Sequence, residues 1–306
     1  MVKGSYLKLP PGELAKRAKK AVAMLGDCTV CAQECRVNRL EGELGICRGG
    51  RLAAVNSYGP HFGEEDVLVG TGGSGTIFFT YCNLSCEFCQ NCEISQLGEG
   101  DEVPAGELAG MMLDLQKRGC HNINLVSPSH FVPQFLEALN VAAEKGLTLP
   151  VVYNTGGYDA PETLDLLDGI VDIYMPDIKF ADDDAGRKYS GAVEYFTVAK
   201  KAVKKMHGQV DDLAVDGRGI AYRGLLVRHL VLPDNLARSE KVFEFLADEV
   251  SKDTFINIMD QYYPAFNAVN YPELDRRITR KEFREAVDAA RRAGLRRIYT
   301  GFNKIF

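Results

Sequence analysis

Short β-rich runs alternate with helical stretches from about residue 76 onward, and this alternation limits the possible folds more than any other feature of the chain. The runs cover residues 76–80, 122–126, 150–154, 171–175, 224–232, 254–259 and 297–300. Helices are predicted between them over 104–118, 133–145, 161–168, 192–207, 239–250 and 279–293. Such alternation predicts an α/β fold with a parallel sheet, either an open doubly wound sheet or a full or partial barrel.

In either fold, functional residues gather at the carboxyl ends of the strands. The residues that directly follow each β-rich run are therefore the candidates for a site. Residues 262–277 contain four aromatic side chains and two prolines. We expect this segment to form an ordered loop over the same end of the sheet.

Composition and charge exclude several classes of protein. Of the 306 residues, 46% are apolar and 25% charged, as in a soluble globular protein. The net charge of −6 lacks the basic footprint of a nucleic-acid-binding protein. No apolar run has the length of a membrane span or a signal peptide, so we expect no membrane partner and a reducing cytoplasmic location.

Eight of the nine cysteines lie in two tight clusters. Because disulfides are rare in a reducing compartment, we interpret these clusters as metal sites. The first cluster, Cys28, Cys31, Cys35 and Cys47, follows a predicted amphipathic helix over 11–25. Four thiols fit a closed zinc site or an iron–sulfur cluster, and the glycines around Cys47 favour zinc. We expect residues 1–55 to form a small metal-binding lobe with a structural or electron-relay role, and residues 56–306 to form the main domain.

The second cluster has the spacing C-x3-C-x2-C at Cys82, Cys86 and Cys89, directly after the first β-rich run. Three thiolates on one loop can hold three irons of a [4Fe–4S] cube and leave the fourth iron open to a ligand that is not protein. The alternative is a closed ferredoxin-like or zinc site with Cys92 as fourth ligand. We expect Cys92 and Cys120 to be thiols without a ligand role.

The run CNLSCEFC after a β-strand, with Phe88 before the third cysteine, resembles the signature of the radical S-adenosylmethionine (SAM) superfamily. The segments VVYNTGGYD, DIYMPDIK, VRHLVLP and MDQYYP extend the resemblance from about residue 72 to 306, toward the branch related to pyruvate formate-lyase activating enzymes. The resemblance implies a partial (β/α)6 TIM-type barrel. It also implies a [4Fe–4S] cluster that binds SAM and cleaves it reductively to a 5′-deoxyadenosyl radical, with a flavodoxin- or ferredoxin-type electron donor.

The resemblance also implies roles for residues at the strand ends. Asp177 and Lys179 form an Asp-x-Lys pattern like that of the activating enzymes, beside the cofactor and the reacting peptide, and are the catalytic candidates. Ser127 and Ser129 stand where the superfamily usually has Gly-Gly-Glu, a departure that removes a charge. Of Arg228 and His229, which alternate on one strand, the inward-facing residue is the cofactor ligand. The full set of predicted cofactor contacts is Phe88, Ser127, Ser129, Asn154, Arg228, His229 and Gln261.

Three functions are compatible with the sequence. The first is a radical SAM enzyme that abstracts hydrogen from a peptide or protein, as activases of glycyl-radical enzymes do. The second applies the same chemistry to a small molecule beneath the aromatic loop over 262–277. The third is an electron-transfer or metal-scaffold protein whose clusters are wholly ligated by protein.

Overall fold

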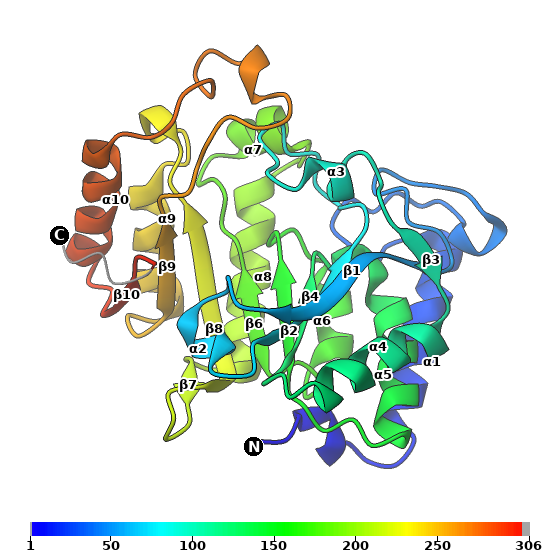
Figure 1. Ribbon diagram of the computed structural model, residues 1–306. Helices are drawn as coiled ribbons and strands as arrows, with labels where there is room; N and C mark the ends of the chain where they lie inside the picture. Colours follow the sequence, from blue (N-terminus) through cyan, green and yellow to red (C-terminus); the bar gives the residue numbers. More distant parts are fainter. Residues whose placement is uncertain (1, 302–306) are drawn as a thin grey trace.

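The computed structural model describes residues 2–301, which form a ten-stranded sheet with helices around it (Figure 1). The strands follow the order β10-β9-β8-β6-β5-β4-β2-β1-β3, and β7 pairs with β8 outside this path. Their bounds are β1 Ala53–His61, β2 Ser74–Phe79, β3 Asp101–Val103, β4 Ile123–Val126, β5 Val151–Thr155, β6 Ile173–Pro176, β7 Ala214–Val215, β8 Ala221–Leu230, β9 Phe255–Met259 and β10 Arg297–Tyr299.

The strands from β2 to β10 along this order are parallel, whereas β1 is antiparallel to both β2 and β3. Within residues 2–301 the sheet does not close on itself, since β3 and β10 are its two edges. Every residue of β5 and β6 is buried, as expected for strands covered on both faces. The predicted α/β class with a mostly parallel, open sheet is confirmed.

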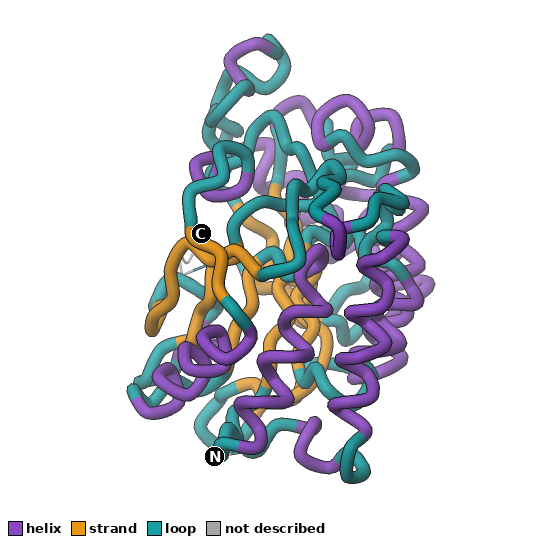
Figure 2. Tube along the Cα trace, turned by 90° about the vertical axis from the view of Figure 1, so that its right-hand side faces the viewer, coloured by secondary structure: helices purple, strands orange, loops and turns teal. Residues whose placement is uncertain are grey.

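Helices cover the strands on the outside and leave the loops gathered at one end (Figure 2). Helix α4 packs on β2 and β4, α8 packs on β6 and β8, and α9 packs against α10. The helices are α1 Glu13–Ala23, α2 Asp66–Val69, α3 Cys92–Ser95, α4 Ala105–Lys117, α5 Val132–Glu144, α6 Pro161–Leu167, α7 Asp183–Ser190, α8 Tyr195–Val210, α9 Ser239–Phe245 and α10 Arg280–Ala293.

Strand β1 and helix α7 are absent from the sequence prediction, although all seven predicted strands and the longer predicted helices are present. Strand β1 has the sequence AAVNSYGPH, whose glycine, proline and asparagine are unusual in strands. Helix α7 is polar and depends on its ends: the Asp182 side chain accepts hydrogen bonds from the first turn, and Gly191 ends the helix with a left-handed φ of 62°. This helix carries Tyr189 and Ser190 to the cysteine loop described below.

The N-terminal segment packs on the sheet's helical layer rather than standing apart from it. Helix α1 lies against α5. The buried Arg39 guanidinium donates to the carbonyl oxygen of His130 at 2.8 Å and to that of Gly50 at 2.8 Å, and it lies over the Phe131 ring. An arginine with its donors satisfied in this way holds residues 28–50 to the turn that follows β4. The described residues do not include Met1 or residues 302–306. These are the outer ends of the two predicted units, 1–55 and 56–306.

No helix among the described residues has the length and apolar character needed to cross a membrane.

Candidate functional site

A cavity of about 370 Å³ opens at the carboxyl ends of the parallel strands. It is the position that the parallel topology predicts for a site. Eight of the predicted site residues line it: Cys86, Phe88, Cys89, Asn154, Asp177, Lys179, Arg228 and Gln261.

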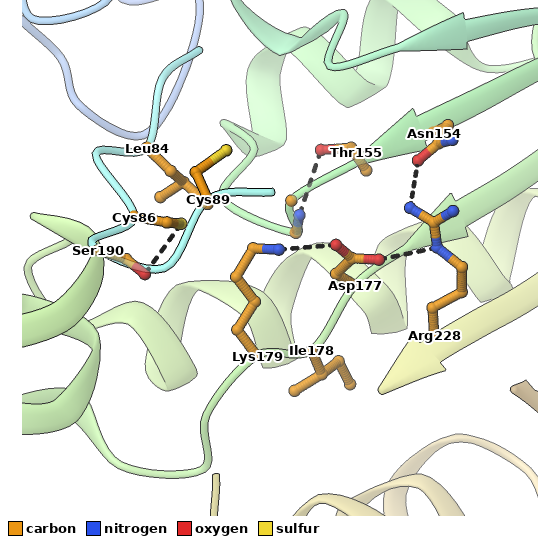
Figure 3. A network of polar contacts seen from close by, with 12 residues as sticks. Leu84, Cys86, Cys89, Asn154, Thr155, Asp177, Ile178, Lys179, Ser190 and Arg228 are labelled. Atoms are coloured by element: carbon orange, nitrogen blue, oxygen red, sulfur yellow. Dashed lines mark hydrogen bonds and ion pairs between the residues drawn. The ribbon is translucent and has the colours of Figure 1, made fainter. Parts of the chain in front are cut away.

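The loop after β2 carries Cys82, Cys86 and Cys89 and is held at several points. The Cys86 sulfur lies 3.1 Å from the Ser190 hydroxyl oxygen (Figure 3), and the Cys89 sulfur lies 3.0 Å from the Ser95 hydroxyl oxygen. The backbone N–H of Ser85 donates to the carbonyl oxygen of Ser190 at 2.9 Å. Helices α7 and α3 therefore fix the loop from its two sides.

Burial, with a smaller contribution from neighbouring cysteines, raises the pKa of Cys82 to about 12 and that of Cys86 to about 11, the latter against the opposing effect of the Lys179 cation. Bound cations would reverse this, since a metal deprotonates its thiol ligands. Among residues 2–301, no three His, Cys, Asp or Glu side chains already converge on a point suited to a single metal ion. A four-iron cube spreads its thiolates over separate irons, and three thiols on one loop beside a cavity suit that group.

Cys92 begins α3 and is absent from the residues that line the cavity. Its thiol is half-buried, and burial followed by the neighbouring Glu93 carboxylate raises its pKa. Cys120 is fully buried beneath β2, where its Cβ lies close to Gly75.

Asp177 is the centre of a partly buried ion-pair network opposite the cysteine loop (Figure 3). It accepts hydrogen bonds from Lys179 Nζ at 2.7 Å and from Arg228 Nε at 2.8 Å. Arg228 also donates through Nη2 to Asn154 Oδ1 at 2.6 Å. Burial alone would raise the pKa of Asp177, but Arg228 and then Lys179 outweigh it and lower the pKa to about 2. Asp177 is therefore ionised throughout the neutral pH range.

Tyr195 at the start of α8 ties together the loops that follow β5 and β6. Its hydroxyl donates toward the carbonyl oxygens of Gly156 at 2.9 Å and Asp177 at 3.1 Å, and it accepts from the backbone N–H of Lys179 at 2.9 Å. Gly157 has a φ of 77°, and a Cβ there would lie 2.4 Å from the Asp177 carbonyl oxygen. Only glycine lets these two loops approach so closely.

Aromatic contacts join the cysteine loop to the predicted loop over 262–277. The Phe88 ring lies 6.0 Å from Phe180 and 6.0 Å from Tyr262, centroid to centroid. Asn267 Nδ2 donates to the Glu87 carboxylate at 2.8 Å, and Gln90 Nε2 donates to the Gln261 carbonyl oxygen at 3.0 Å. The loop therefore packs against the cysteine loop beside the cavity, although none of residues 262–277 lines the cavity itself.

Comparison with known proteins decides the family. The family model described as the radical SAM superfamily matches residues 76–220. The chain is 32% identical over 300 residues to an uncharacterised protein of Methanocaldococcus jannaschii, covering 96% of this chain and 82% of that protein. The chain belongs to the radical SAM superfamily.

Further relatives agree with this membership. A pyruvate formate-lyase-activating enzyme of Clostridium pasteurianum is 25% identical over 190 residues, or 60% of this chain and 69% of that enzyme. Membership identifies the radical SAM chain as an enzyme and implies a [4Fe–4S] cluster and SAM, so the interpretation as an electron-transfer scaffold is not supported.

Solved structures share the fold at low identity. A radical SAM methyltransferase from Sphaerobacter thermophilus superposes with a TM-score of 0.51 at 14% identity, covering 76% of this chain and 67% of that one. SuiB of Streptococcus suis bound to precursor peptide SuiA gives a TM-score of 0.50 at 12% identity, covering 74% of this chain. The radical SAM chain spans only 48% of the length of SuiB, and both likenesses speak for the fold alone.

Three predicted cofactor contacts of this radical SAM enzyme lie away from the cavity lining. His229 faces outward: its Nδ1 lies 2.7 Å from the Ile178 carbonyl oxygen and its Nε2 2.9 Å from the Ser239 hydroxyl. Burial lowers the pKa of His229 to about 4. Ser129 is buried with its hydroxyl 2.9 Å from that of Thr155, and Ser127 has a left-handed φ of 55°. Of the alternating pair, Arg228 is the inward-facing residue.

The N-terminal cysteines of this radical SAM enzyme are near one another, beside the cysteine loop that follows β2. Cys31 and Cys47 are buried, and their pKa values are raised by burial and by neighbouring cysteines of the same set. Gln33, between Cys31 and Cys35, donates through Nε2 to the Asn83 carbonyl oxygen at 2.8 Å. Asn83 in turn lies between Cys82 and Cys86, so a single amide joins the two cysteine segments.

Glu64 and Glu65 are site residues that the sequence analysis missed. They follow β1 in the segment HFGEED and reach the interior of the sheet, where Glu64 lines the cavity. Burial raises the pKa of Glu64 to about 7, although Arg228 opposes the shift. The only signal in the sequence was a pair of adjacent acidic residues, and nothing local placed them near β8 and β9.

Proposed function

We propose that this radical SAM enzyme abstracts a hydrogen atom from a peptide or protein substrate, in the manner of glycyl-radical-enzyme activases. Cys82, Cys86 and Cys89 would hold the [4Fe–4S] cluster. When bound, the cluster and SAM supply a 5′-deoxyadenosyl radical through one-electron cleavage of a carbon–sulfur bond. The observation that carries the proposal is that the cysteine loop and the Asp177 network line one cavity at the strand ends.

The polar residues opposite the loop would orient SAM by fixed charges. Arg228 and Asn154 are assigned to its carboxylate or ribose, and the Asp177–Lys179 pair to the region between SAM and the substrate. Because Asp177 holds both cations within 2.8 Å, neither side chain needs to reorganise when a ligand arrives. Phe88 and Gln261, which also line the cavity, would complete the wall around the bound SAM.

The peptide preference is supported by two likenesses. One is the Asp-x-Lys pattern together with the match to a pyruvate formate-lyase-activating enzyme. The other is the fold shared with SuiB, whose structure contains a precursor peptide. A small-molecule substrate is the second candidate. It is favoured by the aromatic 262–277 loop, which packs against the cysteine loop beside the cavity and would serve as a lid over a small ligand.

We further propose that residues 1–55 form a lobe in which Cys28, Cys31, Cys35 and Cys47 bind a second metal. The sequence preference is zinc, and the alternative is an iron–sulfur cluster. The bond from Gln33 to Asn83 supports a lobe that stabilises the catalytic loop or relays electrons to it. Metal analysis of anaerobically purified protein tests this, because two four-iron clusters require roughly eight irons per chain and little zinc.

The electron would come from a flavodoxin- or ferredoxin-type donor in a reducing cytoplasm. All nine cysteines are free thiols in the structure, which supports such a location.

The decisive experiment is the production of 5′-deoxyadenosine from SAM by reconstituted protein with a strong reductant. We expect product from the wild type, none from Cys86→Ala, and unchanged product from the matched control Cys120→Ala. The Cys92→Ala variant should also remain active, and loss of activity there would favour a closed cluster. Absence of product from the fully reconstituted wild type, or an EPR spectrum of the reduced cluster that SAM leaves unchanged, would reject the proposal.

A further inference from the structure

The segment that follows β1 places two carboxylates inside the sheet. Glu65 is only 5% exposed, and its Oε1 accepts a hydrogen bond from Asn257 Nδ2 at 2.8 Å. Glu64 Oε1 accepts from Asn124 Nδ2 at 3.1 Å. These contacts join the β1–α2 connection to β9 and β4, strands that are distant from it in the sequence.

Acceptor oxygens outnumber donors in this region. Glu65 Oε2, Asn257 Oδ1 and Asn124 Oδ1 are buried and have no hydrogen-bond partner among residues 2–301. Both asparagine amides are oriented by donating to a carboxylate, so turning either one would place two acceptors in contact. Buried polar atoms are normally paired, and three unpaired acceptors in one region therefore indicate a missing donor.

Arg228 does not supply that donor. Its Nε and Nη2 are already bonded to Asp177 and Asn154, and its Nη1 lies 3.6 Å from Glu64 Oε2. The Arg228 guanidinium therefore lies at the boundary between the two spaces, where it offsets part of the charge of Glu64.

A second cavity, of about 200 Å³, adjoins two of the three residues that carry these unpaired oxygens, Glu65 and Asn257, whereas Asn124 does not line it. Glu64, Glu65 and Asn257 line it, as do Gln261 and Tyr299. Glu64, Arg228 and Gln261 line the main cavity too, so the two spaces adjoin. We call this second space the acidic chamber.

We propose that the acidic chamber binds the cationic nitrogen of the substrate, an alkylammonium or guanidinium group, and so holds a neighbouring carbon–hydrogen bond in the main cavity. This inference rests on the proposed function and names the chemical class of its substrate, a lysine- or arginine-like group.

The geometry favours an organic cation over a metal ion. An ammonium offers three N–H donors and a guanidinium five, which suits acceptors that are spread over several residues. Calcium instead takes six to eight oxygen ligands around one point, and only two carboxylates face the chamber apart from the exposed Asp260 at its rim.

The test is titration calorimetry of the anaerobic, cluster-loaded protein in the presence of SAM. The probes are Nα-acetyl-lysine amide and Nα-acetyl-arginine amide, with norleucine and citrulline amides as neutral isosteres. We expect each cationic probe to bind at least about tenfold more tightly than its isostere, a difference of about 1.4 kcal/mol. Glu65→Gln should abolish this difference, whereas Glu137→Gln, which removes an outlying carboxylate paired with Arg51, should leave it intact.

Other outcomes overturn the proposal. Equal affinity for cationic and neutral probes, no binding of either cationic probe in the millimolar range, or a chamber that binds Mn²⁺ in place of the amines would each do so. If Glu65→Gln fails to fold, Asn257→Leu provides the same comparison from the opposite wall. Failure of the proposed function is separable, because it would appear as missing 5′-deoxyadenosine in a protein that still selects cations.

Discussion

Replacing Asp177 by asparagine tests whether the ion-pair network is needed to hold the site together. The substitution keeps the shape of the side chain but removes a negative charge that contacts both Lys179 and Arg228. Asp177 and its partners are at most 20% exposed, so solvent screens these interactions weakly. The drop in the pKa of Asp177 from 3.8 to about 2 corresponds to roughly 2 kcal/mol in favour of the ionised form. Removal of one partner from a buried pair typically costs about 3–5 kcal/mol.

We therefore expect Asp177→Asn to lower the free energy of unfolding by about 2–5 kcal/mol. For a chain of this size that corresponds to a fall in Tm of roughly 3–8 °C, measured by calorimetry of the metal-free protein at pH 7. The matched control is Asp27→Asn, which breaks a contact of 2.6 Å with Arg36 in which both side chains are about 60% exposed. Exposed pairs contribute at most about 1 kcal/mol. A fall in Tm for Asp177→Asn no larger than that of the control would refute the reasoning.

Three further predictions follow from single residues. Burial lowers the pKa of His229 to about 4, whereas the unfolded chain takes up this proton below about pH 6.5. The free energy of unfolding should therefore have its full value above pH 6.5 and fall by about 2 kcal/mol by pH 5. In denaturant titrations, His229→Asn should remove this part of the pH dependence, and an unchanged pH profile would contradict the prediction. Gly157→Ala should lower the free energy of unfolding and the yield of 5′-deoxyadenosine together, since the added Cβ would lie 2.4 Å from the Asp177 carbonyl oxygen. If both measurements match those of the wild type, the two loops do not need to approach so closely. Tyr195→Phe removes one hydroxyl that contacts three backbone groups and should cost about 1–3 kcal/mol in the same titrations, a loss that would be absent if solvent satisfied those groups.

The parallel strands could be predicted from the sequence because each is a short apolar run with a helix after it. The cysteine loop was equally accessible, since a ligand spacing of two or three residues is a local property. Strand β1 was missed because its pairing with β2, rather than the preference of its own residues, makes it a strand.

Residues that meet over long sequence distances were beyond such reasoning. Glu65 and Asn257 are 192 positions apart, and no local pattern relates them. Alternation along β8 predicts that Arg228 and His229 face opposite ways, but not which of them faces the cavity. The hydrogen bonds of His229 with Ile178 and Ser239 on the outer side of the strand show that Arg228 is the inward residue.

An open sheet leaves two strands whose outer backbone groups are free to pair with another chain. In the described part of this protein both of these strands, β3 and β10, are only three residues long. Two of the three residues of β3 are exposed acids, Asp101 and Glu102. Short, charged edges resist strand addition and hence aggregation. Both borders of the described sheet therefore disfavour fibril-like association through added strands.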